Sequence, residues 1–233
     1  MCGRFAFFSA HDAMPALFGL AAEMPGVVAN YNIAPTDLAA VIRRSTDNAT
    51  NELCMLRWGL VPFWAKDVAI GNRLINARAE TVHEKPAFRA AYKRRRCLVP
   101  ADGYYEWHKS ATGKQPYFVT RADDAPFAMA GLWESWTDKD SGDDVETFTL
   151  LTREPNESLA RLHHRMPVIV SSADADAWLE GSIQALGGTS PAVPAADAFG
   201  FRAVSKRVNN PRNKTEDVLE PPTNLADDPL NTD

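Results

Sequence analysis

The second residue of the chain carries the most distinctive chemistry in the sequence. Aminopeptidases remove Met1 when the next residue is small, so we expect a mature chain that begins at Cys2, with an α-amine and a thiol on adjacent carbons. Because an α-amine titrates near ~8, a useful fraction is neutral at pH 7 and can condense with an aldehyde to a Schiff base. The thiol can then close a thiazolidine ring. Two alternatives stay open: the thiol is an acyl nucleophile with the amine as its base, or the position of the cysteine is incidental.

A carboxylic acid and a histidine could move the protons of such a condensation. Glu106 lies between two aromatic residues of a predicted strand, a half-apolar setting that raises the pKa of a carboxyl group and suits general-acid work. The alternative is an outward-facing strand carboxylate. His163 and His164 are adjacent, and on an extended segment they point to opposite faces, so we expect at most one to be catalytic. The alternative is a helix C-terminus, where histidine interacts favourably with the dipole.

An amide and several basic groups are available to orient a substrate. Asn76 can hold an amine or a hydroxyl, or else satisfy loop backbone, and Arg78 is expected to share its strand face. A groove that binds single-stranded nucleic acid needs basic side chains for phosphates and aromatic side chains for bases. The alternative is that the aromatic residues belong to the core and the basic residues are solvated at the surface. The basic residues are Arg89, Lys93–Arg96, Arg202, Lys206, Arg207, Arg212 and Lys214, and the aromatic residues are Trp58, Phe63, Trp64, Tyr104 and Tyr105.

Composition and length exclude several classes of protein. The 233 residues are 45% apolar and 24% charged, which is ordinary for a globular protein and excludes collagen-like, coiled-coil and fully disordered chains. The sequence has no apolar run long enough to span a membrane and no secretory signal at its start, so we expect a cytoplasmic protein. The three cysteines, Cys2, Cys54 and Cys97, cannot close a disulfide framework and lack the paired spacing of a zinc site. We expect no metal and no organic cofactor.

The net charge of −5 is unevenly distributed along the chain. Residues 215–233 carry six of the 30 acidic residues and no lysine or arginine, so the rest of the chain has 25 basic and 24 acidic residues. A local basic face is therefore compatible with the overall acidity. We expect residues 223–233 to form an acidic, disordered tail.

Helices and strands must position these groups. The patterns predict a capped helix within 9–24, a buried strand at 54–64 and a short helix at 80–95. An antiparallel meander of about four strands is predicted for the segments 97–109, 115–122, 127–136 and 146–152. We therefore predict a single α+β domain with a mainly antiparallel, barrel-like β core flanked by short helices.

Seven motifs, taken together and in order, resemble the SRAP family, the SOS response-associated peptidases. They are MCGRF at the start, YNIAPT (31–36), RWGLVPFWA (57–65), NARAET (76–81), RRCLVPADGYYEW (95–107), HHRMPVIV (163–170) and VSKRVNNPRN (204–213). The resemblance covers about residues 2–220. It implies an SRAP domain at 2–222, followed by the tail at 223–233.

The resemblance implies an enzyme of the DNA damage response that crosslinks covalently to abasic sites in single-stranded DNA and has a self-processing peptidase activity. In this family the N-terminal cysteine forms a thiazolidine with the ring-opened deoxyribose. Carried over motif by motif, Cys2 is the nucleophile, Asn76 holds the α-amine or a sugar oxygen, and Glu106 is the acid–base group. The family pattern H-x-R-M-P selects His163, two residues before the arginine, as the catalytic histidine.

The resemblance also implies a channel for DNA. Arg4 and Arg78 are expected to bind phosphates, and Trp64 is expected to stack on a base. Further residues expected to bind DNA or to shape the pocket are Asn32, Pro35, Arg165 and Asn209. The expected partner is single-stranded DNA with abasic sites, and the expected state is a cytoplasmic monomer, nucleoid-associated in a bacterium, without a membrane or a cofactor.

Two other classes of function stay open. Class II glutamine amidotransferases also begin with Met-Cys-Gly, which makes an amidohydrolase with an N-terminal nucleophile an alternative, although their downstream motifs are not found in this sequence. The other alternative is a noncatalytic reader of modified single-stranded DNA in which Cys2 is incidental. A covalent adduct with abasic DNA distinguishes the crosslinking enzyme from both.

Overall fold

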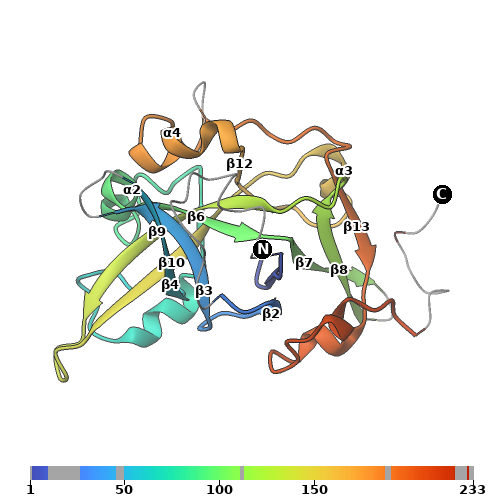
Figure 1. The fold of residues 1–233 in the computed structure, drawn as a ribbon, viewed down its shortest axis with the longest axis horizontal. Helices are drawn as coiled ribbons and strands as arrows, with labels where there is room; N and C mark the ends of the chain where they lie inside the picture. The colour runs from blue at the N-terminus through green and yellow to red at the C-terminus, as the bar shows by residue number, and fades with distance from the viewer. Residues whose placement is uncertain are drawn as a thin grey trace.

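The computed structural model describes residues 2–9, 27–45, 50–110, 113–186, 190–223 and 230 of the 233-residue chain. Strands dominate, and the helices are short (Figure 1). The strands are β1 (Phe5–Phe7), β2 (Asn30–Ile33), β3 (Leu38–Arg44), β4 (Asn51–Trp58), β5 (Asn76–Arg78), β6 (Arg96–Ala101), β7 (Gly103–Ser110), β8 (Gly113–Arg121), β9 (Phe127–Thr137), β10 (Asp144–Arg153), β11 (Met166–Pro167), β12 (Ile169–Val170) and β13 (Phe199–Ala203). The helices are α2 (Arg89–Arg94), α3 (Glu157–Ala160) and α4 (Ala175–Glu180), with 3-10 turns η1 (Val68–Arg73), η2 (Ser172–Asp174), η3 (Lys206–Asn209) and η4 (Glu216–Leu219).

Five strands of the larger sheet close into a ring. Antiparallel pairs join β4 to β3, β3 to β6, β6 to β9 and β9 to β10, and the parallel pair of β10 with β4 completes the circuit. Closure of a sheet removes the open edges that would otherwise need covering. The strands β5, β11 and β12 pair with strands of this ring and extend it. The structure confirms the predicted α+β domain with a mainly antiparallel, barrel-like core.

The smaller sheet has the strand order β13-β8-β7-β1-β2 and is antiparallel throughout. The chain passes from the ring to this sheet at Asp102, between β6 and β7. One carboxylate oxygen of Asp102 accepts hydrogen bonds from the backbone N–H groups of Phe8 and Ser9 at 2.6 and 2.9 Å. In Figure 1 the blue N-terminal segment lies near the centre of the view. Its strand β1 pairs with β7, the first strand after the chain leaves the ring.

A buried tryptophan connects the N-terminal segment to β5. The ring of Trp58 packs edge-on against Phe5, with 5.2 Å between centroids, and stacks on Phe148 at 6.2 Å. Its Nε1 donates a hydrogen bond of 2.9 Å to the carbonyl oxygen of Ile75, immediately before β5. Burying an aromatic side chain of this kind contributes about 1.5–3 kcal/mol. The contacts of Trp58 with Phe5 and Ile75 therefore fix the distance between β1 and β5.

Two predicted elements are shorter in the structure than expected. The strand predicted at 54–64 ends at Trp58, because Gly59 has a φ of +123° and the chain turns away there. The helix predicted at 80–95 is reduced to α2, and residues 79–84 and 86–88 form turns. Phe88, at the N-cap of α2, provides no side-chain hydrogen bond that would extend the helix toward its N-terminus.

The meander prediction also needs correction, because its segments form five strands, β6 to β10, which are divided between the two sheets. The segment 97–109 divides between β6 and β7, which belong to different sheets. Most of the helix predicted within 9–24 lies outside the described residues, as do 224–229 and 231–233 of the predicted tail. Leu230, which is described, packs against the core. Among the described residues, no helix is long and apolar enough to cross a membrane.

We expect Gly59→Ala to be strongly destabilising, because a Cβ there would lie 2.6 Å from the carbonyl oxygen of Gly71. Backbone strain and this clash together should lower the free energy of unfolding by about 3 kcal/mol or more. Gly142→Ala is the matched control, since Gly142 also has a positive φ of +79° but has open space around it. Strain alone should cost about 1 kcal/mol there. Urea unfolding measures the free energy of unfolding of both variants. Equal losses of stability in Gly59→Ala and Gly142→Ala would contradict the clash at Gly59.

Candidate functional site

The four predicted catalytic residues come from separate elements. Cys2 precedes β1, Asn76 begins β5, Glu106 lies in β7, and His163 lies in the turn between α3 and β11. Nδ2 of Asn76 donates a hydrogen bond of 2.7 Å to the carbonyl oxygen of Cys2. Nδ1 of His163 lies 3.6 Å from Oε1 of Glu106. The structure therefore brings these residues together where the two sheets meet.

The thiol of Cys2 is fully buried, and its sulfur donates a weak hydrogen bond of 3.7 Å to the carbonyl oxygen of Arg4. Burial raises the pKa of this thiol, and the nearby charge of Glu106 raises the same pKa further. At neutral pH the sulfur is therefore a thiol rather than a thiolate.

Burial moves the pKa values of Glu106 and His163 in opposite directions. Glu106 is 3% exposed, and desolvation raises the pKa of its carboxyl group to about 7. Desolvation of the partly buried His163 lowers its pKa to about 4. Near neutral pH the carboxyl group is therefore partly protonated while the imidazole is neutral. At this pH the carboxyl group of Glu106 can therefore act either as a proton donor or as a proton acceptor.

We assign the tautomer of neutral His163 from the contacts that its Nδ1 makes with Arg165. The backbone N–H of Arg165 donates to Nδ1 at 3.0 Å, and the carbonyl oxygen of Arg165 lies 3.2 Å from the same nitrogen. A proton on Nδ1 would oppose the N–H of Arg165, so we assign the proton of the neutral ring to Nε2. The unprotonated Nδ1 is then the nitrogen nearest to Glu106.

The expectation that His163 and His164 point to opposite faces is wrong. Their ring centroids lie 4.2 Å apart, with 34° between the ring planes. Both residues belong to a turn, where the alternation of an extended strand does not apply. His164 is exposed whereas His163 is partly buried, so His163 is the histidine beside Glu106.

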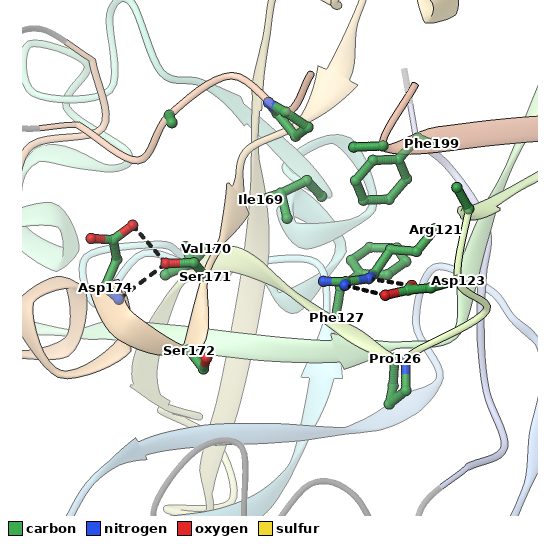
Figure 2. Close-up of a pocket in the computed structure, with 14 residues that line it drawn as sticks. Arg121, Asp123, Pro126, Phe127, Ile169, Val170, Ser171, Ser172, Asp174 and Phe199 are labelled. Carbon is green, nitrogen blue, oxygen red and sulfur yellow. Dashed lines mark hydrogen bonds and ion pairs between the residues drawn. The ribbon is translucent and has the colours of Figure 1, made fainter. Parts of the chain in front are cut away.

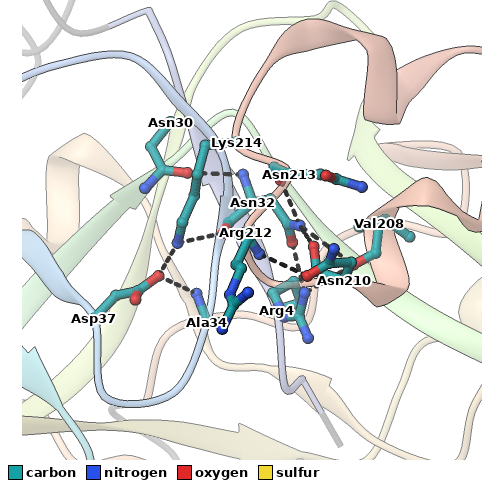
Figure 3. Close-up of polar contacts among 10 residues, drawn as sticks. All are labelled: Arg4, Asn30, Asn32, Ala34, Asp37, Val208, Asn210, Arg212, Asn213 and Lys214. Carbon is teal, nitrogen blue, oxygen red and sulfur yellow. Dashed lines mark hydrogen bonds and ion pairs between the residues drawn. The ribbon is translucent and has the colours of Figure 1, made fainter.

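A second polar cluster anchors the N-terminal segment to η3 and the residues that follow it (Figure 3). Nη1 of Arg4 donates to Oδ1 of Asn32 and to the carbonyl oxygen of Val208, both at 2.8 Å. Asn32 is fully buried, and its Nδ2 donates to the carbonyl oxygens of Val208, Asn210 and Asn213. Asn32 therefore ties β2 to the chain after η3 from inside the protein, and its expected role toward DNA stays a prediction.

The other residues expected to contact DNA differ in their exposure. Trp64 is 48% exposed, Arg78 is exposed, and Pro35 is half-buried. Asn209 is exposed, and its Oδ1 accepts a hydrogen bond of 2.8 Å from Nε1 of Trp107, the neighbour of Glu106 in β7. Trp64 and Arg78 are therefore accessible to a bound strand, whereas Asn209 braces β7.

Arg165, another residue expected to contact DNA, pairs with a carboxylate. It is buried, and its guanidinium forms a bidentate ion pair with Glu80 at 2.6 and 2.8 Å. The side chain is thus engaged by Glu80 in this structure, and binding of DNA by Arg165 stays a prediction. Sequence reasoning missed Glu80 because its partner is 85 residues away and no local spacing indicates the pair.

A separate pocket of about 500 Å³ lies between the β8–β9 turn, β12 and β13 (Figure 2). Phe127, Ile169 and Phe199 contribute to its apolar wall, and Arg121 pairs with Asp123 at its rim. None of the predicted catalytic residues lines it. Within the described part of the chain, no group of three or more His, Cys, Asp or Glu side chains is arranged to hold a metal ion.

Known proteins resemble this chain in sequence and in fold. The family described as SOS response associated peptidase (SRAP) matches residues 1–211, so the chain belongs to the SRAP family. A solved structure of a protein from Bacteroides thetaiotaomicron superposes with a TM-score of 0.78 at 24% identity, over 94% of this chain and 99% of that one. That likeness shows that the fold is shared.

Curated relatives cover nearly the whole chain. Abasic site processing protein YoaM of Bacillus subtilis (strain 168) is 39% identical over 226 residues, which are 94% of this chain and 98% of YoaM. Abasic site processing protein YedK of Escherichia coli (strain K12) is 30% identical over 230 residues, covering 95% of this chain and 100% of YedK. Abasic site processing protein HMCES of Gallus gallus is 29% identical over 221 residues, covering 82% of this chain and 66% of HMCES.

The raised pKa of Glu106 predicts a pH-dependent stability. The folded carboxyl group binds its proton more tightly than the unfolded one (pKa ~4.3), so its stabilising contribution is full at low pH and is lost as the pH rises through about 7. Relative to the unchanged protein, we expect the free energy of unfolding of Glu106→Gln to increase by about 2 kcal/mol between pH 5 and pH 8. Urea unfolding at the two pH values measures this, and a constant difference would contradict the raised pKa.

Proposed function

We propose that the protein binds single-stranded DNA and captures abasic sites covalently through Cys2, after Met1 has been removed. The observation that carries the proposal is the 2.7 Å hydrogen bond from Asn76, which holds the main chain of Cys2 in the same buried site as Glu106. The names of the relatives YoaM and YedK describe abasic site processing, which supports this choice of substrate.

The proposed capture forms two bonds to one carbon. The amine of Cys2 attacks the aldehyde carbon of the ring-opened deoxyribose, and the resulting carbinolamine loses water to give an imine. The sulfur then adds to the imine carbon while the thiol proton moves to the nitrogen, which closes the thiazolidine ring. One aldehyde and one aminothiol become one thiazolidine and one water, so no oxidant or reductant is consumed.

Glu106 and His163 are proposed to move the protons. An abasic site is mostly a closed hemiacetal, so the sugar ring must be opened before an amine can attack it. With a pKa of about 7, Glu106 can act as a base in ring opening and as an acid toward the hydroxyl that leaves the carbinolamine. The Nδ1 of His163, which lies 3.6 Å from Oε1 of Glu106, accepts the N–H of Arg165, so His163 is proposed to act on the substrate through Nε2–H.

The protonation state of Cys2 determines the order of the two bonds. Burial raises the pKa of its thiol, so the sulfur is a poor first nucleophile at neutral pH. An α-amine, with a pKa near ~8, has a neutral fraction that can attack first. The thiol then needs only to reach an imine carbon that is already attached to the same residue, which is a short intramolecular step.

Asn76 has a second role in the proposal. Its Nδ2 holds the carbonyl oxygen of Cys2, and its Oδ1 is buried with no hydrogen-bond partner among the described residues. A buried acceptor in this state costs about 1–3 kcal/mol. An N–H of the freed α-amine would satisfy it and turn the nitrogen lone pair toward the substrate.

Cationic and aromatic side chains, exposed at Trp64 and Arg78 and half-buried at Arg4, are proposed to hold the DNA strand. Arg4 and Arg78, which flank Cys2 and Asn76 in the sequence, would bind phosphates, and Trp64 would stack on a base. An abasic site has no base to read, so contacts to the backbone and to base faces are sufficient. Removal of Met1 is supplied either by a host aminopeptidase or by the peptidase activity in the family's name.

Single-stranded DNA with one abasic site should give an adduct that survives a denaturing gel and thiol reductants. We expect Cys2→Ala to lose the adduct and Cys2→Ser to give at most a reversible imine, because a hydroxyl closes a weaker ring. Glu106→Gln should slow adduct formation by about 100-fold with DNA affinity nearly unchanged. An adduct that persists in Cys2→Ala would contradict the mechanism, and glutamine hydrolysis without an adduct would favour an amidohydrolase.

The DNA contacts are tested with an abasic analogue that lacks the aldehyde and cannot react. We expect Trp64→Ala to weaken binding by about 1–3 kcal/mol through loss of stacking. Arg78→Ala should reduce the slope of log Kd against log salt concentration by about one, the change expected for the loss of one phosphate contact. Fluorescence anisotropy over a salt series measures both. Lys139→Ala, an exposed residue between β9 and β10, is the control and should change neither; an unchanged salt slope in Arg78→Ala would exclude Arg78 from the interface.

A further inference from the structure

An ion pair between buried Arg165 and exposed Glu80 lies next to the turn that carries His163. Nη1 and Nη2 of Arg165 donate to the two carboxylate oxygens of Glu80 at 2.6 and 2.8 Å, and Nη2 also donates to the carbonyl oxygen of Thr152. The arginine side chain is 8% exposed, and the glutamate side chain is 36% exposed. A bidentate pair of this kind fixes direction as well as distance.

The pair joins two parts of the site that are far apart in sequence. Glu80 follows β5, which begins with Asn76, and Thr152 lies in β10, the neighbour of β5 in the sheet. Arg165 directly precedes β11 and ends the turn of His163. The ion pair therefore ties the turn of the histidine to the strand that carries the anchor of Cys2.

The backbone of Arg165 in turn holds the imidazole. Its N–H donates to Nδ1 of His163 at 3.0 Å, and the same nitrogen lies 3.6 Å from Oε1 of Glu106. If Arg165 lost its carboxylate partner, a buried charge would be left uncompensated, and the turn would have to shift to solvate it. A displacement of ~1 Å at a reacting group can cost on the order of 100-fold in rate.

We propose that Glu80 and Arg165 are positioning residues, whose ion pair holds the imidazole of His163 in the Nε2-protonated tautomer beside Glu106. The effect on rate rests on the proposed crosslinking function, whereas the effect on the tautomer does not. The competing assignment, an Arg165 that binds a DNA phosphate, predicts a loss of DNA affinity instead.

The test is Glu80→Gln, which removes the charge and keeps the shape. Its matched control is Glu134→Gln, which breaks a second ion pair, the 2.6 Å contact of Glu134 in β9 with Arg95. For each variant, three quantities are measured: the crosslinking rate at saturating abasic DNA, the Kd for the unreactive abasic analogue, and the ¹⁵N signals of His163. These signals are assigned by their disappearance in His163→Gln.

We expect Glu80→Gln to lower the rate at saturation by about tenfold or more, with Kd unchanged, and to convert His163 from one tautomer to a mixture. Glu134→Gln should leave the rate, Kd and tautomer unchanged. Glu80→Asp keeps the charge and should restore part of the rate. If Glu80→Gln does not fold, Glu80→Asp takes its place in the comparison with Glu134→Gln.

An unchanged tautomer together with an unchanged rate in Glu80→Gln would overturn the proposal. Weaker DNA binding at an unchanged saturating rate would also overturn it and would assign Arg165 to the DNA interface. If the unchanged protein forms no crosslink at all, the proposed function fails, while the tautomer comparison between Glu80→Gln and Glu134→Gln still decides whether the ion pair positions His163.

Discussion

The hydrogen bond from Asn76 to the carbonyl oxygen of Cys2 is the contact on which the rest of the site depends. Chain ends are usually the least ordered part of a domain, yet the proposed nucleophile Cys2 must be fixed within reach of an acid. The 2.7 Å bond fixes its main chain, and Trp58 supports both partners by packing on Phe5 and binding the carbonyl oxygen of Ile75. One buried aromatic side chain thus sets the separation between β1, which follows Cys2, and β5, which begins with Asn76.

The burial that orders the chain end also adjusts the chemistry available there. Desolvation brings the pKa of Glu106 to about 7 and that of His163 to about 4. The same residues in an exposed site would be a carboxylate and a partly charged imidazole, which could not supply a proton to a leaving hydroxyl at neutral pH. The consequence is a carboxyl group whose ionisation destabilises the fold above neutral pH. In the proposed mechanism, function and stability are therefore coupled through the side chain of Glu106.

The fold class and the identity of the candidate residues could be predicted from the sequence, because alternating segments and short motifs are local features. Closure of the ring could not, since it depends on a parallel pairing of β10 with β4 between distant segments. The end of β4 depends on a positive φ at Gly59, which an apolar pattern does not reveal. The ion pair of Glu80 with Arg165 is equally nonlocal. The relation of His163 to His164 was mispredicted because a strand rule was applied to a turn.

The mass of the crosslinked product tests the central claim most directly. The protein is reacted with a short single-stranded oligonucleotide that carries one abasic site, and the product is weighed intact before and after borohydride treatment. The account predicts the mass of the chain without Met1 plus the oligonucleotide minus one water, unchanged by borohydride because a closed thiazolidine has no imine to reduce. A product that retains Met1, or one that gains two hydrogens on reduction, would contradict it.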